Sequence, residues 1–294
     1  MTEGAALRVP LELLACPACR GTLELSDQGL RCGACAAAYP VADGVPLLMT
    51  AQDRARFQAR LGEAEGAAMA ARYSERGSAS ITARLKRALH PPLPLVHNPA
   101  EPRLPCPAGS YNLWIGGGGR ATPGFFNLDI GRFPGVDLLA NAECLPLRDA
   151  VLDAVECDAV LEHVENPDAV ASEIFRVLKP GGLVHAVVPF CHPYHAYPAD
   201  FRRWTRAGLA HWFAAIGFEG LQSGLRTGAT ATLPAFLLEY NKVVFGDKTL
   251  GQAAYAAAGW LLFPLRYLDR WLNRRPTAHL LANHVFLLAR KPPP

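Results

Sequence analysis

Residues 152–190 read LDAVECDAVLEHVENPDAVASEIFRVLKPGGLVHAVVPF. The middle of this stretch has the pattern of an amphipathic helix, since Asn166 is a suitable N-cap and Pro167 suits the first helical position. The apolar residues of the helix fall on one face, and they are Val170, Ile174, Val177 and Leu178. Residues 179–182 end the helix, and the apolar run 183–190 has the composition of a buried strand. An apolar segment, a helix and a buried strand in this order predict a βαβ unit.

The same alternation of short apolar runs and helical patterns extends over about residues 111–228. It predicts an α/β fold, a Rossmann-like sheet with helices on both faces. Residues 111–120 read YNLWIGGGGR, an apolar strand that runs into glycines and lets a ligand approach backbone amides. Residues 125–130 read FFNLDI, a second short strand that ends in an acid, Asp129. In nucleotide-binding α/β folds such an acid accepts hydrogen bonds from ribose hydroxyls, while an ordinary solvated turn aspartate is the alternative.

These ordered motifs resemble the class I S-adenosylmethionine-dependent methyltransferases, specifically a large branch that acts on small molecules. The resemblance covers about residues 111–218 and is strongest in LEHV at 161–164 and RVLKPGG at 176–182. It implies methyl transfer as the activity and S-adenosyl-L-methionine as the cofactor. It also implies that the glycine run and Cys157, at the end of a strand, lie beside the methionine part of the cofactor. Asp129 would then bind the ribose, and residues 141–143 would lie along the adenine. The implied cofactor-binding residues are Gly116, Gly117, Gly118, Asp129, Asn141, Ala142, Glu143 and Cys157.

Two departures from the family pattern concern the methionine end of this site. Trp114 stands where the family has an acid, two residues before the first glycine. The interval from Gly116 to Asp129 is too short for a normal first helix and contains a proline, so we expect a tight loop there. A degenerate, non-catalytic member of the family therefore stays open as an alternative.

A nicotinamide-dependent enzyme is the competing interpretation of a Rossmann-like chain. It would need a complete G-x-G-x-x-G motif that opens a helix. Here the sixth position is Ala121 and Pro123 follows it, and no Tyr-x-x-x-Lys pair is found. The sequence therefore does not favour this class.

Four of the eight cysteines form two close pairs, Cys16 with Cys19 and Cys32 with Cys35. Each two-residue gap lets both thiolates face one point, and two such turns supply a tetrahedral set of sulfurs that suits Zn²⁺. Residues 11–49 closely resemble the Trm112-like zinc-ribbon family, whose small modules bind or accompany methyltransferases. The resemblance implies a structural metal and a docking or stabilising role, with a partner protein as one option.

The loop at residues 189–205 reads PFCHPYHAYPADFRRWT and follows the last strand of the βαβ unit. Ligands of open parallel sheets bind beyond the carboxyl ends of the strands, so this loop is expected to face the transferred methyl group. His195, and after it His192, are the candidate catalytic bases for an oxygen acceptor. Simple capping and packing of the loop is the alternative, with Thr205 as the N-cap of the next helix.

The segment before the C-terminus is apolar. Residues 249–265 carry no charge. This uncharged run is short for a membrane span, and arginines follow it. A substrate-covering lid is the favoured interpretation and an interfacial amphipathic helix the alternative. A final strand is expected over 283–291.

The chain has 294 residues with a formal net charge of +3 and a pI of about 8.4. This charge is too small for an obligate nucleic-acid binder. The start lacks the pattern of a secretory signal, so the cytoplasm, with contact at the membrane periphery as an option, is the expected compartment. We expect a ribbon over 1–50, a helical linker or cap over 51–105, and a methyltransferase domain over 106–294 that includes an apolar helical insertion or lid at 229–282.

The sequence thus predicts an enzyme that methylates a small-molecule, glycan or lipid-linked acceptor. An RNA methyltransferase is one alternative, with slight support from Arg84, Lys86 and Arg87. The second alternative is a non-catalytic platform that binds partner proteins.

Overall fold

The computed structural model describes residues 6–62, 96–196, 199–246 and 248–293. Within these residues a nine-stranded mixed sheet has the order β11-β12-β10-β9-β6-β7-β8-β5-β4. Its strands are β4 (Val41–Ala42), β5 (Val45–Leu48), β6 (Asn112–Ile115), β7 (Phe126–Asp129), β8 (Leu138–Ala140), β9 (Leu152–Asp158), β10 (Leu178–Pro189), β11 (Glu219–Thr227) and β12 (His284–Arg290). The strands from β5 to β10 in this order are parallel, and β12 is antiparallel to both of its neighbours.

Helices α4 (Pro167–Val177) and α5 (Arg206–Ile216) begin where the sequence predicts. The Asn166 side chain accepts a hydrogen bond from the Ala169 amide at 3.2 Å, and the Thr205 hydroxyl accepts one from the Gly208 amide at 3.0 Å. Each side chain satisfies an amide that the first helical turn leaves without a backbone partner. Both predicted caps and the final strand over 284–290 are therefore confirmed.

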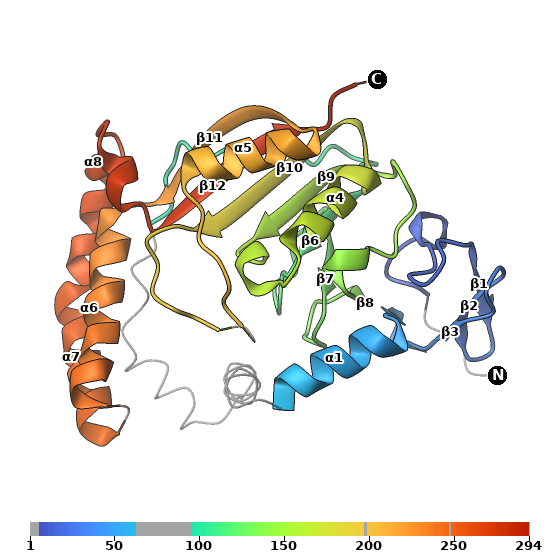
Figure 1. Cartoon of the computed structure of the whole chain (residues 1–294), viewed down its shortest axis with the longest axis horizontal. Coiled ribbons are helices and arrows are strands. Elements are labelled where there is room, and N and C mark those ends of the chain that lie inside the picture. Colours follow the sequence, from blue (N-terminus) through green and yellow to red (C-terminus); the bar gives the residue numbers. More distant parts are fainter. Residues whose placement is uncertain (1–5, 63–95, 197–198, 247, 294) are drawn as a thin grey trace.

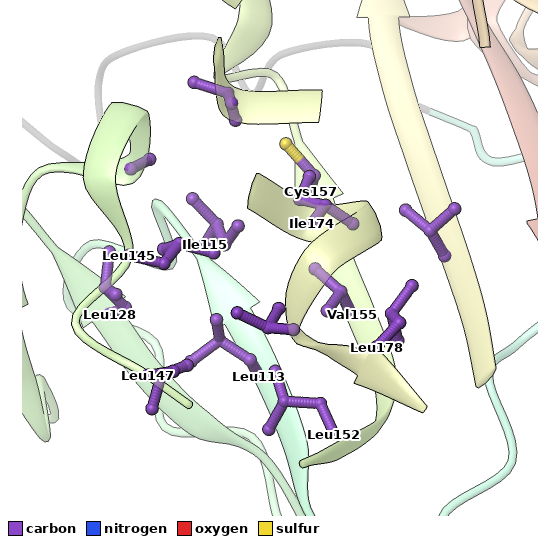
Figure 2. Packing of buried hydrophobic residues seen from close by; sticks show 14 of the residues in the cluster. Leu113, Ile115, Leu128, Leu145, Leu147, Leu152, Val155, Cys157, Ile174 and Leu178 are labelled. Carbon is purple, nitrogen blue, oxygen red and sulfur yellow. The ribbon is translucent and has the colours of Figure 1, made fainter. Parts of the chain in front are cut away.

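The hydrophobic core lies between the sheet and these helices (Figure 2). Alternate residues of β10, Val184, Ala186 and Val188, belong to it together with Ile174 of α4. Because successive side chains of a strand point to opposite faces, His185 lies on the other face, where its Nε2 is 3.5 Å from Glu101. The described residues thus form the predicted Rossmann-like α/β fold.

The ribbon is a three-stranded antiparallel sheet of β1 (Leu23–Ser26), β2 (Gly29–Cys32) and β3 (Ala38–Tyr39), preceded by the short 3-10 helix η1 (Leu11–Leu13). The β4–β5 hairpin that follows it belongs to the main sheet, because β5 pairs in parallel with β8 through Leu47 and Leu139. The polypeptide therefore passes from the ribbon into the edge of the large sheet with no free linker between them.

Helix α1 (Ala51–Gly62) follows this hairpin directly and confirms a helix at the start of the predicted 51–105 segment. Arg84, Lys86 and Arg87 lie outside the described residues. Between β11 and β12 the chain forms a helical insertion of α6 (Ala229–Phe245), α7 (Thr249–Leu262), η4 (Phe263–Leu268), α8 (Asp269–Leu272) and η5 (Ala278–Leu281). The α6–α7 hairpin and the ribbon lie at opposite ends of the molecule (Figure 1). Among the described helices, none is both long enough and apolar enough to cross a membrane.

Candidate active site

A cavity of about 370 Å³ opens at the carboxyl ends of the parallel strands. Its volume lies within the range of about 300–1,000 Å³ that is usual for small-molecule sites. Its lining comes from the ends of four parallel strands: Ile115 of β6 and Gly116 after it, Leu128 and Asp129 of β7, Ala140 of β8, and Ala159 and Val160 after β9. This is where open α/β sheets bind ligands.

The glycine run closes the cavity at the end of β6. Residues 116–125 contain no helix, so the predicted tight loop is confirmed. Gly116 has a φ of +71°, and a Cβ there would lie 2.3 Å from a methyl group of Val160, so a side chain at this position would be strained. Asn127 stabilises the loop, since its side-chain amide donates to the carbonyls of Gly118 and Arg120 at 3.0 Å each.

Asp129 lies at the cavity wall and is nearly buried. Its carboxylate accepts hydrogen bonds from the amides of Gly118 at 3.0 Å and Gly131 at 2.9 Å. The pKa of Asp129 is raised, because the effect of burial is larger than that of these amide hydrogen bonds, which lower it. Each carboxylate oxygen retains a further lone pair that a ribose hydroxyl could use, so the position fits the predicted role.

The predicted adenine segment forms the 3-10 helix η2 (Ala142–Cys144), and Asn141, Ala142 and Glu143 all line the cavity. The Asn141 side chain caps η2 by accepting from the Glu143 amide at 3.0 Å. The Glu143 carboxylate accepts from the Asn166 amide at 3.1 Å, which ties this wall to the start of α4.

Helix α1 supplies a wall of the cavity that the sequence interpretation missed. Asp53, Arg56 and Phe57 line it. The Asn141 amide donates to Asp53 at 2.9 Å, and the Arg56 guanidinium lies 3.9 Å from Glu143. The sequence predicts a helical segment over 51–105, and Thr50 caps its start, since its hydroxyl accepts from the Asp53 amide at 3.1 Å. That prediction includes a helix but not its position against the cavity.

Three of the predicted cofactor residues are not in the cavity lining. Gly117 and Gly118 do not line it, and a Cβ on Gly117 would lie 2.4 Å from the side-chain Oδ1 of Asn127. Cys157 is fully buried in the hydrophobic cluster (Figure 2), and burial raises the pKa of its thiol well above the ordinary value.

The two predicted catalytic histidines are neighbours on the loop after β10. His195 lines the cavity, whereas His192 lies behind it at a ring separation of 4.3 Å. Burial is the main cause that lowers the pKa of both histidines. The pKa of His192 falls to about 4, and that of His195 falls below its ordinary value, so both rings are neutral near pH 7. Asp200 accepts from the His195 amide at 2.8 Å and is itself held by two hydrogen bonds from Arg203.

Glu162 of the 3-10 helix η3 (Leu161–His163) is a further acidic group, beside two histidines that line the cavity. Its side chain is completely buried, and both His163 Nε2 and His195 Nε2 lie 3.7 Å from its Oε1. Burial is the largest cause that raises the pKa of Glu162, to about 7. The LEHV motif contained this residue, but the sequence interpretation assigned it no role.

The four ribbon cysteines lie together as predicted. All four sulfurs are within 4.8 Å of one another, with Cys16 to Cys35 at 3.7 Å and Cys19 to Cys32 at 3.5 Å. A tetrahedral zinc ion with bonds of about 2.3 Å separates its sulfurs by about 3.8 Å, and no disulfide competes for these thiols. The donor set therefore fits a structural zinc ion.

The comparisons with known proteins match one segment in the ribbon and one in the α/β part of the chain. Residues 128–186 match the methyltransferase domain family, and residues 11–44 match the Trm112p-like protein family. A UPF0434 protein of Nitrosococcus oceani is 46% identical over 46 residues, which are 15% of this chain and 78% of that protein. A UPF0434 protein of Azotobacter vinelandii is also 46% identical over 46 residues, which are 15% of this chain and 75% of that protein.

Two solved structures show low similarity to parts of this chain. The [4+2]-cyclase SpnF is 18% identical with a TM-score of 0.41, over 63% of this chain and 76% of that chain. A chain of a complex that contains the Haloferax volcanii Trm112 methyltransferase activator is 17% identical with a TM-score of 0.40, over 65% of this chain and 85% of that chain.

The cavity and the family match of residues 128–186 confirm the prediction of a methyltransferase that uses S-adenosyl-L-methionine. The four-cysteine cluster and the family match of residues 11–44 confirm the predicted zinc ribbon. Through its N-terminal ribbon the chain belongs to the family of the UPF0434 proteins, and it joins this Trm112p-like module to an S-adenosyl-L-methionine-dependent methyltransferase.

Proposed function

We propose that the enzyme methylates the polar head of a lipid-linked small molecule or glycan while it is bound to an anionic membrane surface. The exposed apolar face of the α6–α7 hairpin is the observation that carries this proposal. The cofactor cavity and the histidines of the 189–205 loop supply the chemistry.

The apolar face of α6 points away from the protein. Its large exposed side chains recur three and four residues apart, which places them in one stripe along the helix. They are Leu233, Phe236, Leu237, Tyr240, Val243 and Val244. In a helix packed on a core such a stripe faces inward, so its exposure here favours contact with an apolar phase.

Basic side chains lie on η4, on α8 and just after α8, and η4 and α8 both contact α6. Arg266, Arg270, Arg274 and Arg275 follow α7, and the single acid of residues 249–282, Asp269, is completely buried. The Arg275 guanidinium lies 3.9 Å from the ring centroid of Trp271, at the boundary between the apolar and charged parts. Apolar insertion beside a cationic border matches a bilayer with anionic headgroups.

The hairpin leaves the sheet at the edge where the cavity opens. Thr227 at the end of β11 and Pro189 at the end of β10 both pair with His284 of β12. The His284 ring lies 5.1 Å from that of His192, which is 4.3 Å from that of His195. A row of packed imidazoles thus connects the base of the hairpin to the cavity wall, so the hairpin and the cavity lie at the same edge of the sheet.

In this proposal Asp129, Asn141, Ala142, Glu143 and the glycine run hold the cofactor. His195 activates the acceptor oxygen, and His192 supports it from behind the cavity wall. The bound cofactor supplies the methyl group. The protein aligns the acceptor and excludes water, which are the main contributions an enzyme makes to such a displacement.

Two measurements test the proposal. Sedimentation with phosphatidylglycerol vesicles at low salt should recover the protein, whereas the double variant Leu237→Ser/Val243→Ser and the variant Arg270→Glu should stay in the supernatant. The variant Leu25→Ser removes an exposed leucine of the ribbon and serves as the matched control. Radiolabelled methyl groups should enter the lipid extract of the producing cells and not their water-soluble metabolites or RNA.

Equal binding of all variants to vesicles, or label only in RNA or soluble metabolites, would exclude this function. Concentration-dependent dimerisation that Leu237→Ser abolishes, without any vesicle binding, would show instead that the stripe pairs with a second copy.

A further inference from the structure

The Glu162 carboxylate lies in an environment that its protein neighbours do not explain. Its side chain has no solvent exposure, and neither oxygen has a hydrogen-bond partner among the described residues. A buried carboxylate without partners is costly, so such groups normally pair with a cation or bind a metal. The nearest nitrogens are the Nε2 atoms of His163 and His195, at 3.7 Å each.

These two distances are too long for hydrogen bonds, which join nitrogen and oxygen at about 2.7–3.2 Å. They are close to the separation of two ligands on one metal ion, which is about 3.0–3.6 Å for bonds of about 2.0–2.2 Å. The Oε1 atom of Glu162 and one nitrogen of each histidine all lie within 4.8 Å of one another.

The second nitrogen of each ring is oriented by a hydrogen-bond acceptor. His163 Nδ1 lies 2.6 Å from the carbonyl oxygen of Ala199, and His195 Nδ1 lies 3.3 Å from both the Pro193 carbonyl oxygen and an Asp200 oxygen. Carbonyl and carboxylate oxygens only accept, so each Nδ1 carries the proton, and Nε2 is the nitrogen of each ring that lies 3.7 Å from Glu162. Metal-binding histidines are held in this way by a carbonyl or carboxylate on the other nitrogen.

We propose that Glu162 Oε1, His163 Nε2 and His195 Nε2 bind a divalent transition-metal ion such as Zn²⁺, separate from the zinc ion of the ribbon. Two histidines and one carboxylate are a ligand set of catalytic zinc sites, which keep a further position open. His163 and His195 both line the cavity, so the open position faces it. Resting on the proposed function, this position would take the acceptor oxygen as an alkoxide whose proton has passed to solvent in the cavity, and His195 would hold the metal instead of accepting that proton. The methyl group would then pass from the sulfonium to this oxygen, and the demethylated cofactor would leave.

Metal stoichiometry and Co²⁺ spectra of the full chain test this site. The protein is stripped with a chelator and reconstituted with Co²⁺. It should bind about two equivalents: one with the intense thiolate charge-transfer band of the ribbon, and one with only the weaker bands of nitrogen and oxygen ligands. Glu162→Gln and His195→Ala should each lower the total to about one and leave the thiolate band unchanged.

The control variant His211→Ala removes an exposed histidine of α5 and should retain about two equivalents. If Glu162→Gln does not fold, as judged by circular dichroism, the Co²⁺ stoichiometry of His195→Ala serves as the test. Cys19→Ser should lose only the thiolate band of the ribbon and keep the equivalent bound by nitrogen and oxygen ligands. About one equivalent in the unmodified chain, or a second equivalent that persists in His195→Ala, would overturn the proposal. The stoichiometry does not depend on the acceptor, so failed vesicle binding would leave this site standing.

Discussion

Arg20 of the ribbon donates a hydrogen bond of 2.8 Å to Glu173 on α4 of the methyltransferase domain. Arg176 holds the same carboxylate from the next turn, at 2.9 Å and 2.8 Å. The second oxygen of Glu173 also accepts from the Leu145 amide at 2.8 Å, beside the cavity wall. One nearly buried carboxylate therefore joins the zinc ribbon, helix α4 and the segment that holds η2.

We expect Glu173→Gln to lower the free energy of unfolding by about 1–3 kcal/mol, because two guanidinium groups and an amide would lose a charged acceptor. Urea denaturation followed by circular dichroism measures this. The variant Glu219→Gln is the control, since its partner Arg290 is well exposed and surface pairs contribute at most about 1 kcal/mol. Equal losses in the two variants would contradict the role of Glu173.

The same carboxylate gives a pH dependence. Burial would raise the pKa of Glu173, but its hydrogen bonds with Arg176 and Arg20 and their positive charges outweigh burial and lower it below its ordinary value of 4.5. Its contribution to stability is then complete above pH 4.5 and is lost as the pH falls through the lowered value. The stability difference between the unmodified chain and Glu173→Gln should therefore shrink below this pH. A difference that stays constant from neutral to acid pH would contradict it.

Cys19→Ser should release the ribbon zinc and also weaken cofactor binding. The ribbon runs into β5, which pairs with β8, and α1 follows β5 to the cavity wall. Loss of the metal should therefore lower the thermal midpoint by several degrees and raise the Kd for S-adenosylmethionine. Calorimetry measures both, with the exposed Cys106→Ser as control. Normal cofactor affinity in zinc-free Cys19→Ser would show that the ribbon acts independently.

Asp129→Asn should weaken S-adenosylmethionine binding by about 10- to 100-fold, or about 1.4–2.7 kcal/mol, because the carboxylate would accept the ribose hydroxyls. Titration calorimetry with the cofactor and with its demethylated product tests this. The control Asp27→Asn changes an exposed aspartate of the ribbon. Unchanged affinity in a folded Asp129→Asn protein would show that Asp129 only stabilises the glycine loop, through the Gly118 amide, and does not bind the cofactor.

Phe57→Ala should raise the Kd for the cofactor severalfold and have little effect on stability, because Phe57 is half-buried and lines the cavity from α1. The neighbouring Gln58→Ala, on the exposed side of the helix, should bind as the unmodified chain does. If both variants bind equally well, α1 is not part of the cofactor site.

The short-range features of the molecule could be predicted from the sequence because neighbouring residues determine them. The cap of α4 needs Asn166 and Pro167 in sequence, the ribbon needs its two cysteine pairs, and the loop after β6 follows from glycines and a proline that leave no room for a helix. Asp129 could be located because a strand pattern ends at it.

Contacts between distant segments were decided only by the tertiary structure. No local pattern shows that β5 pairs with β8, that α1 brings Phe57 to the cavity, or that Glu162 and His195 meet across the loop after β10. The α6 stripe shows the same limit, because its helical periodicity is identical whether the apolar face is buried or exposed. Sequence spacing determines which side chains share a face, and only the packing of the whole chain determines what that face meets.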